Sequence, residues 1–188
     1  MNAFSVESQF ILKNWDRVDE LRKAVDRCES EMTAYLHSLE GILKKEPWWH
    51  TGLKFVAETV DQCYISCDDW ANGSNEYVIW IGVEHFSLDS VFTAEDPPSC
   101  YLWLQSRAAE IGGAVMKYVE RDNELKKHLA KGTYGQKSRY LLKKKLRRWY
   151  PEEIEEFGSG APLREVAAFM ASVYQAIQGY KLRTKGRD

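Results

Sequence analysis

The chain has 188 residues, of which 44% are hydrophobic and 29% charged, a balance typical of a folded globular protein and unlike that of a disordered one. No apolar run approaches the roughly 18 residues of a membrane-spanning helix, and the first residues show no secretory signal. We therefore predict one α+β domain over residues 1–188, cytoplasmic, with reduced cysteines and no membrane partner.

The net charge of −2 is unevenly distributed along the chain. Residues 46–100 carry one Lys or Arg against ten acidic residues, whereas residues 101–188 carry eighteen against ten. Two interpretations remain open. Either the acidic and basic regions neutralise each other within the fold, or a basic face binds an anionic partner.

The first predicted element is a long amphipathic helix over residues 6–45. Apolar residues recur every seven positions from Phe4 to Leu39, and a second series joins at a three-residue offset. This is the pattern of a coiled-coil seam, and Pro47 ends it. At ~1.5 Å per residue the helix would span about 60 Å, which is longer than a compact domain of this size requires.

An apolar seam of this kind needs a partner. The last helix of the chain carries a similar pattern but is about half as long, so pairing between the two would leave part of the first seam bare. We therefore expect partial internal packing together with a homodimer. The residues predicted to form the dimer seam are Val18, Leu21, Val25, Met32, Tyr35 and Leu39.

Residues 50–105 are predicted to form a short antiparallel sheet of three or four strands. The candidate strands are rich in β-branched and aromatic residues, and the turns between them are too short for a parallel crossover. The run at 77–84 is apolar on both faces, which is typical of a central strand. The strand runs are 53–58 and 60–67 (as one bent strand or two), 77–84 and 100–105.

Residues 106–182 are predicted to be helical, and residues 183–188 form a tail. Three helices are expected after the sheet, and each has a Gly or Pro residue at or near one of its ends. They cover residues 106–131, 136–149, and 162 onward.

The helix predicted at 136–149 is strongly basic. From Lys117 to Arg148 there are twelve Lys and Arg residues against three acids. Cations on both flanks of a docked helix suit contact with phosphates or an acidic protein. The acidic run from Glu152 to Glu156 could instead fold back on them. The candidate nucleic-acid-binding residues are Lys137, Arg139, Lys143, Lys144, Lys145, Arg147 and Arg148.

Two other features could serve RNA or metal binding. Aromatic residues in the strands form either a base-stacking platform or part of the core: Tyr64, Trp80, Tyr101 and Trp103. Cys63 and Cys67 could suggest a metal site, but on one extended strand their Cα atoms lie about 13 Å apart, too far to share one tetrahedral zinc. We predict no metal and no cofactor.

One short motif points to catalysis. Arg121, followed by His128 with six residues between them, resembles the R-x4–6-H motif of HEPN ribonucleases. The resemblance implies an all-helical fold in which two subunits bring Arg and His together to cleave RNA. A degenerate metal-dependent nuclease is a further alternative, with Asp61, Asp68 and Asp69 as possible metal-binding carboxylates.

The sequence favours a non-catalytic binding or regulatory protein. It would self-associate through its helices and contact nucleic acid or an acidic partner through the basic helix. The alternatives are a nuclease of a toxin or defence type and a protein–protein adaptor that uses the N-terminal seam.

Overall fold

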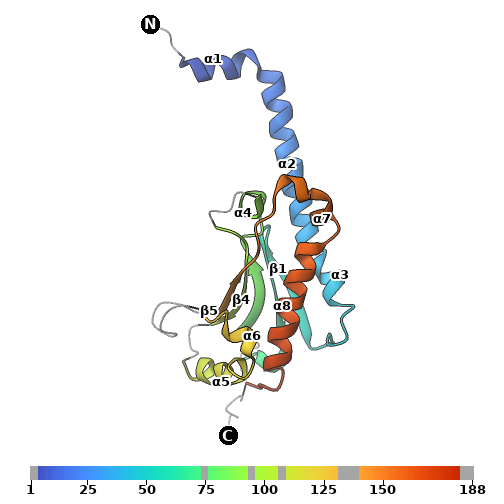
Figure 1. The fold of residues 1–188 in the computed structure, drawn as a ribbon, viewed down its shortest axis with the longest axis vertical. Helices are drawn as coiled ribbons and strands as arrows, with labels where there is room; N and C mark the ends of the chain where they lie inside the picture. The colour runs from blue at the N-terminus through green and yellow to red at the C-terminus, as the bar shows by residue number, and fades with distance from the viewer. Residues whose placement is uncertain (1–3, 73–75, 93–95, 106–108, 131–139, 183–188) are drawn as a thin grey trace.

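The structure is a computed structural model that describes residues 4–72, 76–92, 96–105, 109–130 and 140–182 (Figure 1). It confirms the predicted α+β class, with a long N-terminal helical segment, an antiparallel sheet and further helices. Within the described residues the sheet has five strands, one or two more than the three or four that the sequence predicts.

The N-terminal helical segment has three parts: α1 (Val6–Lys13), α2 (Trp15–His37) and α3 (Leu39–Leu43). The prediction of one continuous helix over 6–45 was therefore wrong at two points. At Asn14 the backbone leaves helical geometry (φ −118°, ψ 26°), and the side-chain amide donates to the Phe10 carbonyl at 2.8 Å. At Ser38 the hydroxyl donates to the Tyr35 carbonyl at 2.6 Å. Both side chains compete locally with the helical hydrogen-bond ladder.

The five strands form a meander in which each strand pairs with the next one in the chain, always antiparallel. The two candidate runs at 53–58 and 60–67 are two strands joined by a tight turn at Val60 and Asp61. The central strand is β3, as its two apolar faces suggest. The strands are β1 (Leu53–Thr59), β2 (Gln62–Cys67), β3 (Ile79–Glu84), β4 (Ser99–Leu104) and β5 (Tyr140–Lys145).

The prediction of a helix at 136–149 was wrong, because residues 140–145 form strand β5 at the edge of the sheet. Leu142 pairs with Leu102 of β4, and both side chains are buried. Without β5, the ladder groups along the outer edge of β4 would lack a strand partner. Residues 136–139 of the predicted helix lie outside the described residues.

The other predicted helices are partly confirmed. Instead of one helix over 106–131 there are α5 (Ala109–Val119) and α6 (Asn123–Lys126), separated where Asp122 caps α6. The last helix, α8 (Ala161–Ile177), begins with Pro162 in its first turn, as predicted. Four short elements complete the described part of the fold: the 3-10 turns η1 (Asp68–Trp70) and η2 (Pro151–Glu153), and the helices α4 (Leu88–Phe92) and α7 (Ile154–Gly158).

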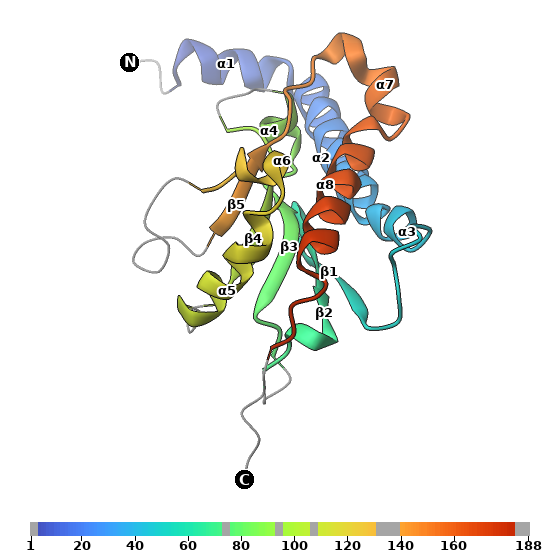
Figure 2. The ribbon, with the colours of Figure 1, turned by 60° about the horizontal axis from the view of Figure 1, so that its bottom comes forward.

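The core lies between α8 and one face of the sheet (Figure 2). Ile79 and Ile81 of β3 point to this face and are fully buried, as are Val166 and Met170 of α8. Burying each such side chain stabilises the fold by about 1.5–3 kcal/mol. Within the described part of the chain, no helix is both long and apolar enough to span a membrane.

Candidate functional site

The N-terminal arm, which we define as residues 4–25, extends away from the rest of the molecule (Figure 1). None of the residues of α1 is buried. The exposed fractions are 65% for Phe10, 67% for Leu21 and 51% for Val25. The other large apolar residues exposed on the arm are Phe4, Val6, Ile11, Leu12 and Trp15.

The predicted dimer seam divides into a bare half and a packed half. Leu21 and Val25 are exposed and Val18 is partly exposed, whereas Met32 and Leu39 are buried within the chain's own core. Tyr35 is partly buried. Its hydroxyl donates to the Phe157 carbonyl at 2.7 Å, and its ring stacks on Phe157 with centroids 5.0 Å apart. The first three seam residues therefore remain available to a partner, and the last three are used internally.

Two ion pairs within the arm stabilise its helix, but they leave its apolar residues exposed. The Asp19 carboxylate forms ion pairs with Arg22 at 3.0 Å and with Lys23 at 2.7 Å, both about one turn further along α2. Such exposed pairs contribute a few tenths of a kcal/mol each. Contiguous apolar residues that remain exposed in this way are typical of interaction surfaces.

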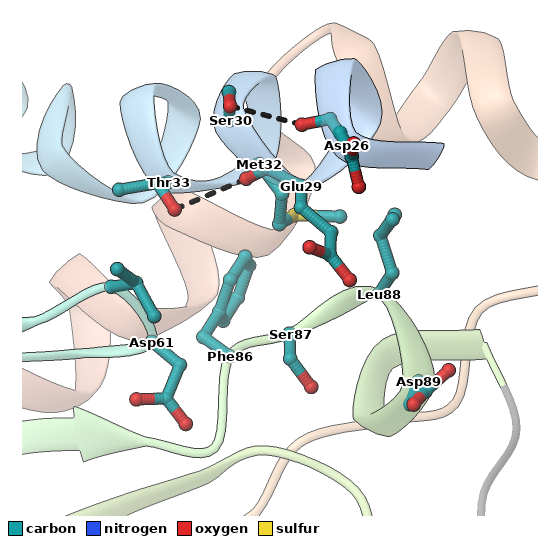
Figure 3. A pocket seen from close by; sticks show the side chains of 11 residues that line it. Asp26, Glu29, Ser30, Met32, Thr33, Asp61, Phe86, Ser87, Leu88 and Asp89 are labelled. Atoms are coloured by element: carbon teal, nitrogen blue, oxygen red, sulfur yellow. Dashed lines mark hydrogen bonds between the residues drawn. The ribbon is translucent and has the colours of Figure 1, made fainter. Parts of the chain in front are cut away.

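A groove of about 490 Å³ lies where the arm joins the body (Figure 3). We call it the α2 groove. One wall is α2, and the other is built from the β1–β2 turn and the segment that leads from β3 into α4. Its lining residues are Asp26, Glu29, Ser30, Met32, Thr33, Val60, Asp61, Phe86, Ser87, Leu88 and Asp89.

The groove has an apolar floor and acidic walls. Phe86 and Met32 are almost fully buried and face each other at its base (Figure 3). Asp26 and Glu29 extend from α2 toward the opposite wall, which carries Asp61 and Asp89. Among the described residues that line the groove, four are carboxylates and none is Lys or Arg.

A backbone hydrogen bond links the two segments of the far wall, next to the pairing of β2 with β3. His85, at the end of β3, adopts a left-handed conformation with φ of 59°, which turns the chain sharply. The N–H of the next residue, Phe86, then donates to the Asp61 carbonyl at 2.9 Å. No local sequence pattern predicts this groove, because its walls come from three separate parts of the chain.

The predicted basic surface is largely neutralised by acidic residues of the same chain. Lys143 contacts Glu84 with 2.7 Å between Nζ and Oε1, and Lys144 contacts Glu165 of α8 at 2.8 Å. Lys145 lies 3.4 Å from Asp96. Since Glu84 belongs to β3 and Glu165 to α8, the first two ion pairs link β5 to other parts of the fold.

Two further predicted phosphate contacts are arginines that follow β5. Arg147 contacts Glu153 at 2.7 Å and Glu156 at 3.2 Å, and this guanidinium lowers the pKa of the Glu153 carboxyl. The Arg148 side chain donates to the Phe92 carbonyl at 3.3 Å. Lys137 and Arg139, the remaining two predicted phosphate contacts, lie outside the described residues.

The candidate catalytic pair lies in a mixed α+β fold and not in the all-helical fold that the ribonuclease resemblance implies. Arg121 follows α5, and its guanidinium lies over the Tyr118 ring, 5.2 Å from the centroid. His128 follows α6 and is partly buried against Phe169, a position that lowers its pKa. Both side chains therefore have structural contacts.

The strand aromatics stack on each other across the face of the sheet that points away from α8. Trp80 lies between Tyr64, at 4.9 Å between ring centroids, and Trp103, at 4.2 Å. Both faces of the central indole are therefore already covered. Tyr101 is buried and accepts a hydrogen bond from the Gln62 side chain at 3.0 Å. These contacts favour packing over base stacking.

The cysteines and carboxylates show no metal centre within the described residues, where no group of three potential ligands converges. All four cysteines are free thiols. Cys63 is buried, and burial raises its pKa to about 12, which suits a small apolar core residue better than a metal ligand.

Comparison with protein-family models, curated proteins and solved structures found no match to this chain.

Proposed function

We propose that this is a non-catalytic binding protein that self-associates through its N-terminal arm. The observation that carries the proposal is the exposure of the arm's apolar residues, from Phe4 to Val25, on a helix that projects from the body. Covering such residues is favourable, at about 1.5–3 kcal/mol for each large side chain that is fully buried. A cytoplasmic location belongs to the same proposal and is supported by the free thiols.

The other predicted functions have less support. A polyanion-binding surface would need free cations, but Lys143, Lys144 and Arg147 each contact an acidic residue of the same chain. A nuclease would need reactive groups that converge, and Arg121 and His128 instead pack against neighbouring rings. Self-association through the arm is therefore the function that the geometry supports best.

Replacing Leu21 by Gln tests the proposal. Leu21 is 67% exposed in the single chain, so covering it in a dimer would be worth about two thirds of a full burial. That amounts to about 1–2 kcal/mol per chain and about 2–4 kcal/mol per dimer. The dissociation constant of the dimer, measured by sedimentation equilibrium, should rise by about 30- to 700-fold.

Arg27→Gln is the matched control, because Arg27 is an exposed polar residue of the same helix. It should leave the dissociation constant within about threefold of the wild-type value, and neither variant should change the far-ultraviolet circular dichroism of the monomer. A wild-type chain that stays monomeric up to 100 μM (about the concentration where weak dimers form) would refute the proposed self-association.

A further inference from the structure

We propose that the α2 groove docks a short segment of another protein, one that carries Lys or Arg side chains on both sides of large apolar side chains. The groove is separate from the exposed apolar surface of the arm, and this inference does not depend on the arm's self-association. Three features of the groove support it: the charge of its walls, the apolar side chains between them, and the fixed position of both walls.

Both walls of the groove are acidic (Figure 3). Three of the lining carboxylates, those of Asp26, Glu29 and Asp61, form no ion pair with any described residue. Arg22 lies one turn before Asp26 on α2, but it is already paired within the arm at 3.0 Å. The far wall also belongs to residues 46–100, which carry one Lys or Arg against ten acids. A surface with this excess of carboxylates favours a cationic occupant.

Apolar side chains lie between the acidic walls. Met32 and Phe86 form the floor, and Leu88 also lines the groove. Val60 is 68% exposed, although it occupies a two-residue hairpin turn between β1 and β2. Such turns favour Gly, Asn and Asp, so a β-branched residue gives this turn no conformational advantage. Its exposed surface is available to an apolar side chain of the occupant, which therefore carries more than charge.

Both walls are already fixed in the single chain. On the α2 wall Met32 is 7% exposed, and the hydroxyls of Ser30 and Thr33 donate to carbonyls of their own helix at 2.9 and 3.1 Å. The far wall is fixed by the pairing of β2 with β3 and by the hydrogen bond from the Phe86 N–H to the Asp61 carbonyl at 2.9 Å. The volume of about 490 Å³ lies within the ~300–1,000 Å³ of typical ligand pockets. Docking into such a preformed groove requires little ordering of the protein.

The test is the binding of three hexapeptides with blocked ends to the full chain, measured by isothermal titration calorimetry. The probe is Lys-Leu-Phe-Lys-Leu-Arg. In one control peptide Ser replaces Leu and Phe, and in the other Glu replaces Lys and Arg. We expect a dissociation constant of about 100 μM or lower for the probe and values at least about tenfold higher for both controls. A probe that does not bind at about 1 mM, or a Ser peptide that binds as tightly as the probe, would overturn the inference.

Charge reversals on α2 locate the binding. Asp26→Lys and Glu29→Lys should each weaken probe binding about tenfold, because each replaces an attraction by a repulsion. Glu31→Lys is the matched control. Glu31 is an exposed acid of the same helix, and at about 100° per residue it lies on the side away from the other two. It should change the dissociation constant by less than about twofold, and an equal effect of all three variants would show an attraction to the whole chain and not to the groove.

Two further variants separate the groove from the arm. Val60→Ser should weaken probe binding about fivefold and leave the Ser peptide unaffected, because it removes apolar surface from the exposed turn. Leu21→Gln removes apolar surface from the arm and should leave probe binding unchanged even where it dissociates the dimer. Loss of probe binding in Leu21→Gln, with retention in Val60→Ser, would place the peptide on the arm and contradict the inference.

Carbodiimide cross-linking locates the probe directly, since it joins a Lys amine of the peptide to a carboxylate in contact with it. Mass spectrometry of the digested complex should find the probe attached to Asp26, Glu29 or Asp61. Attachment mainly to carboxylates of the arm, such as Glu7 or Glu20, would show that the groove is not the docking site.

Discussion

Replacing Lys143 by Met should destabilise the fold, because this cation neutralises a buried carboxylate. The side chain of Glu84 is 7% exposed. Its carboxylate forms an ion pair with Lys143 at 2.7 Å and accepts a hydrogen bond from the Tyr140 hydroxyl at 2.6 Å. Removing one partner of a fully buried ion pair costs about 3–5 kcal/mol, whereas an exposed pair is worth at most about 1 kcal/mol. The Lys143 side chain is 34% exposed, so we expect a loss of about 1–3 kcal/mol.

Urea denaturation followed by tryptophan fluorescence measures this loss. Lys145→Met is the matched control on the same strand, because Lys145 and its partner Asp96 are 59% and 69% exposed. The control should change the free energy of unfolding by no more than about 0.5 kcal/mol. Adding Glu84→Gln to Lys143→Met should recover part of the loss, since the buried charge is then absent.

The reasoning is refuted if Lys143→Met unfolds at the same urea concentration as wild type. A variant that kept full stability but lost salt-sensitive binding to single-stranded nucleic acid would show instead that the cation serves a partner. That result would restore the predicted phosphate contacts on this segment.

The fold and its thiols give three further predictions. Gly82→Ala should destabilise the fold by at least about 2 kcal/mol, because a Cβ there would lie 2.5 Å from the Cys63 carbonyl oxygen and 2.6 Å from the Tyr101 hydroxyl. Gly113→Ala, where a Cβ meets nothing within 4 Å, should instead stabilise α5 by up to about 1 kcal/mol; thermal unfolding compares the two. Since burial raises the pKa of Cys63 from 9.0 to about 12, the native state binds this proton more tightly than the unfolded state. Stability should therefore fall as pH rises from about 9 to 12, and a constant urea midpoint over that range would contradict the assignment. At pH 8 a thiol reagent should label Cys28 and spare the buried cysteines, and mass spectrometry of the labelled peptides checks this.

Much of the helical and strand content could be predicted from the sequence, because periodic apolar residues report which side of an element is buried. The heptad pattern from Phe4 to Leu39 correctly indicated a helical segment that its own chain does not fully cover. The breaks at Asn14 and Ser38 were not predictable from that pattern. They depend on single side chains that bond to nearby carbonyls.

Residues 140–149 show why the remainder of the fold was not predictable. Leu142, Leu146 and Trp149 follow helical spacing, but residues 140–145 pair with β4 as strand β5. Pairing with a neighbouring strand can override the preference of a local pattern. Because residues 140–145 form a strand, their basic side chains do not line the helical face that was predicted. Its neutralisation was partly foreseeable, since the acidic run from Glu152 follows at once and does contact Arg147.

In the candidate site, only the exposed apolar residues of the arm could be predicted from the sequence. Leu21 and Val25 were expected to be available to a partner, and they are exposed. The far wall of the groove was not predictable, because Asp61 and Leu88 are brought beside α2 by the hairpin turn and the sharp bend at His85. Contacts of this kind between distant segments leave no local signal in a single sequence.

The most direct test of the account is amide hydrogen exchange across α1 and α2, measured by mass spectrometry at several protein concentrations. If a second copy covers the arm, the amides of residues 6–25 should be protected at high concentration and exchange faster on dilution. Amides of the sheet core, such as those of β3, should exchange at the same rate throughout. Rapid exchange of the arm at every concentration would contradict the central claim that this helix pairs with another chain.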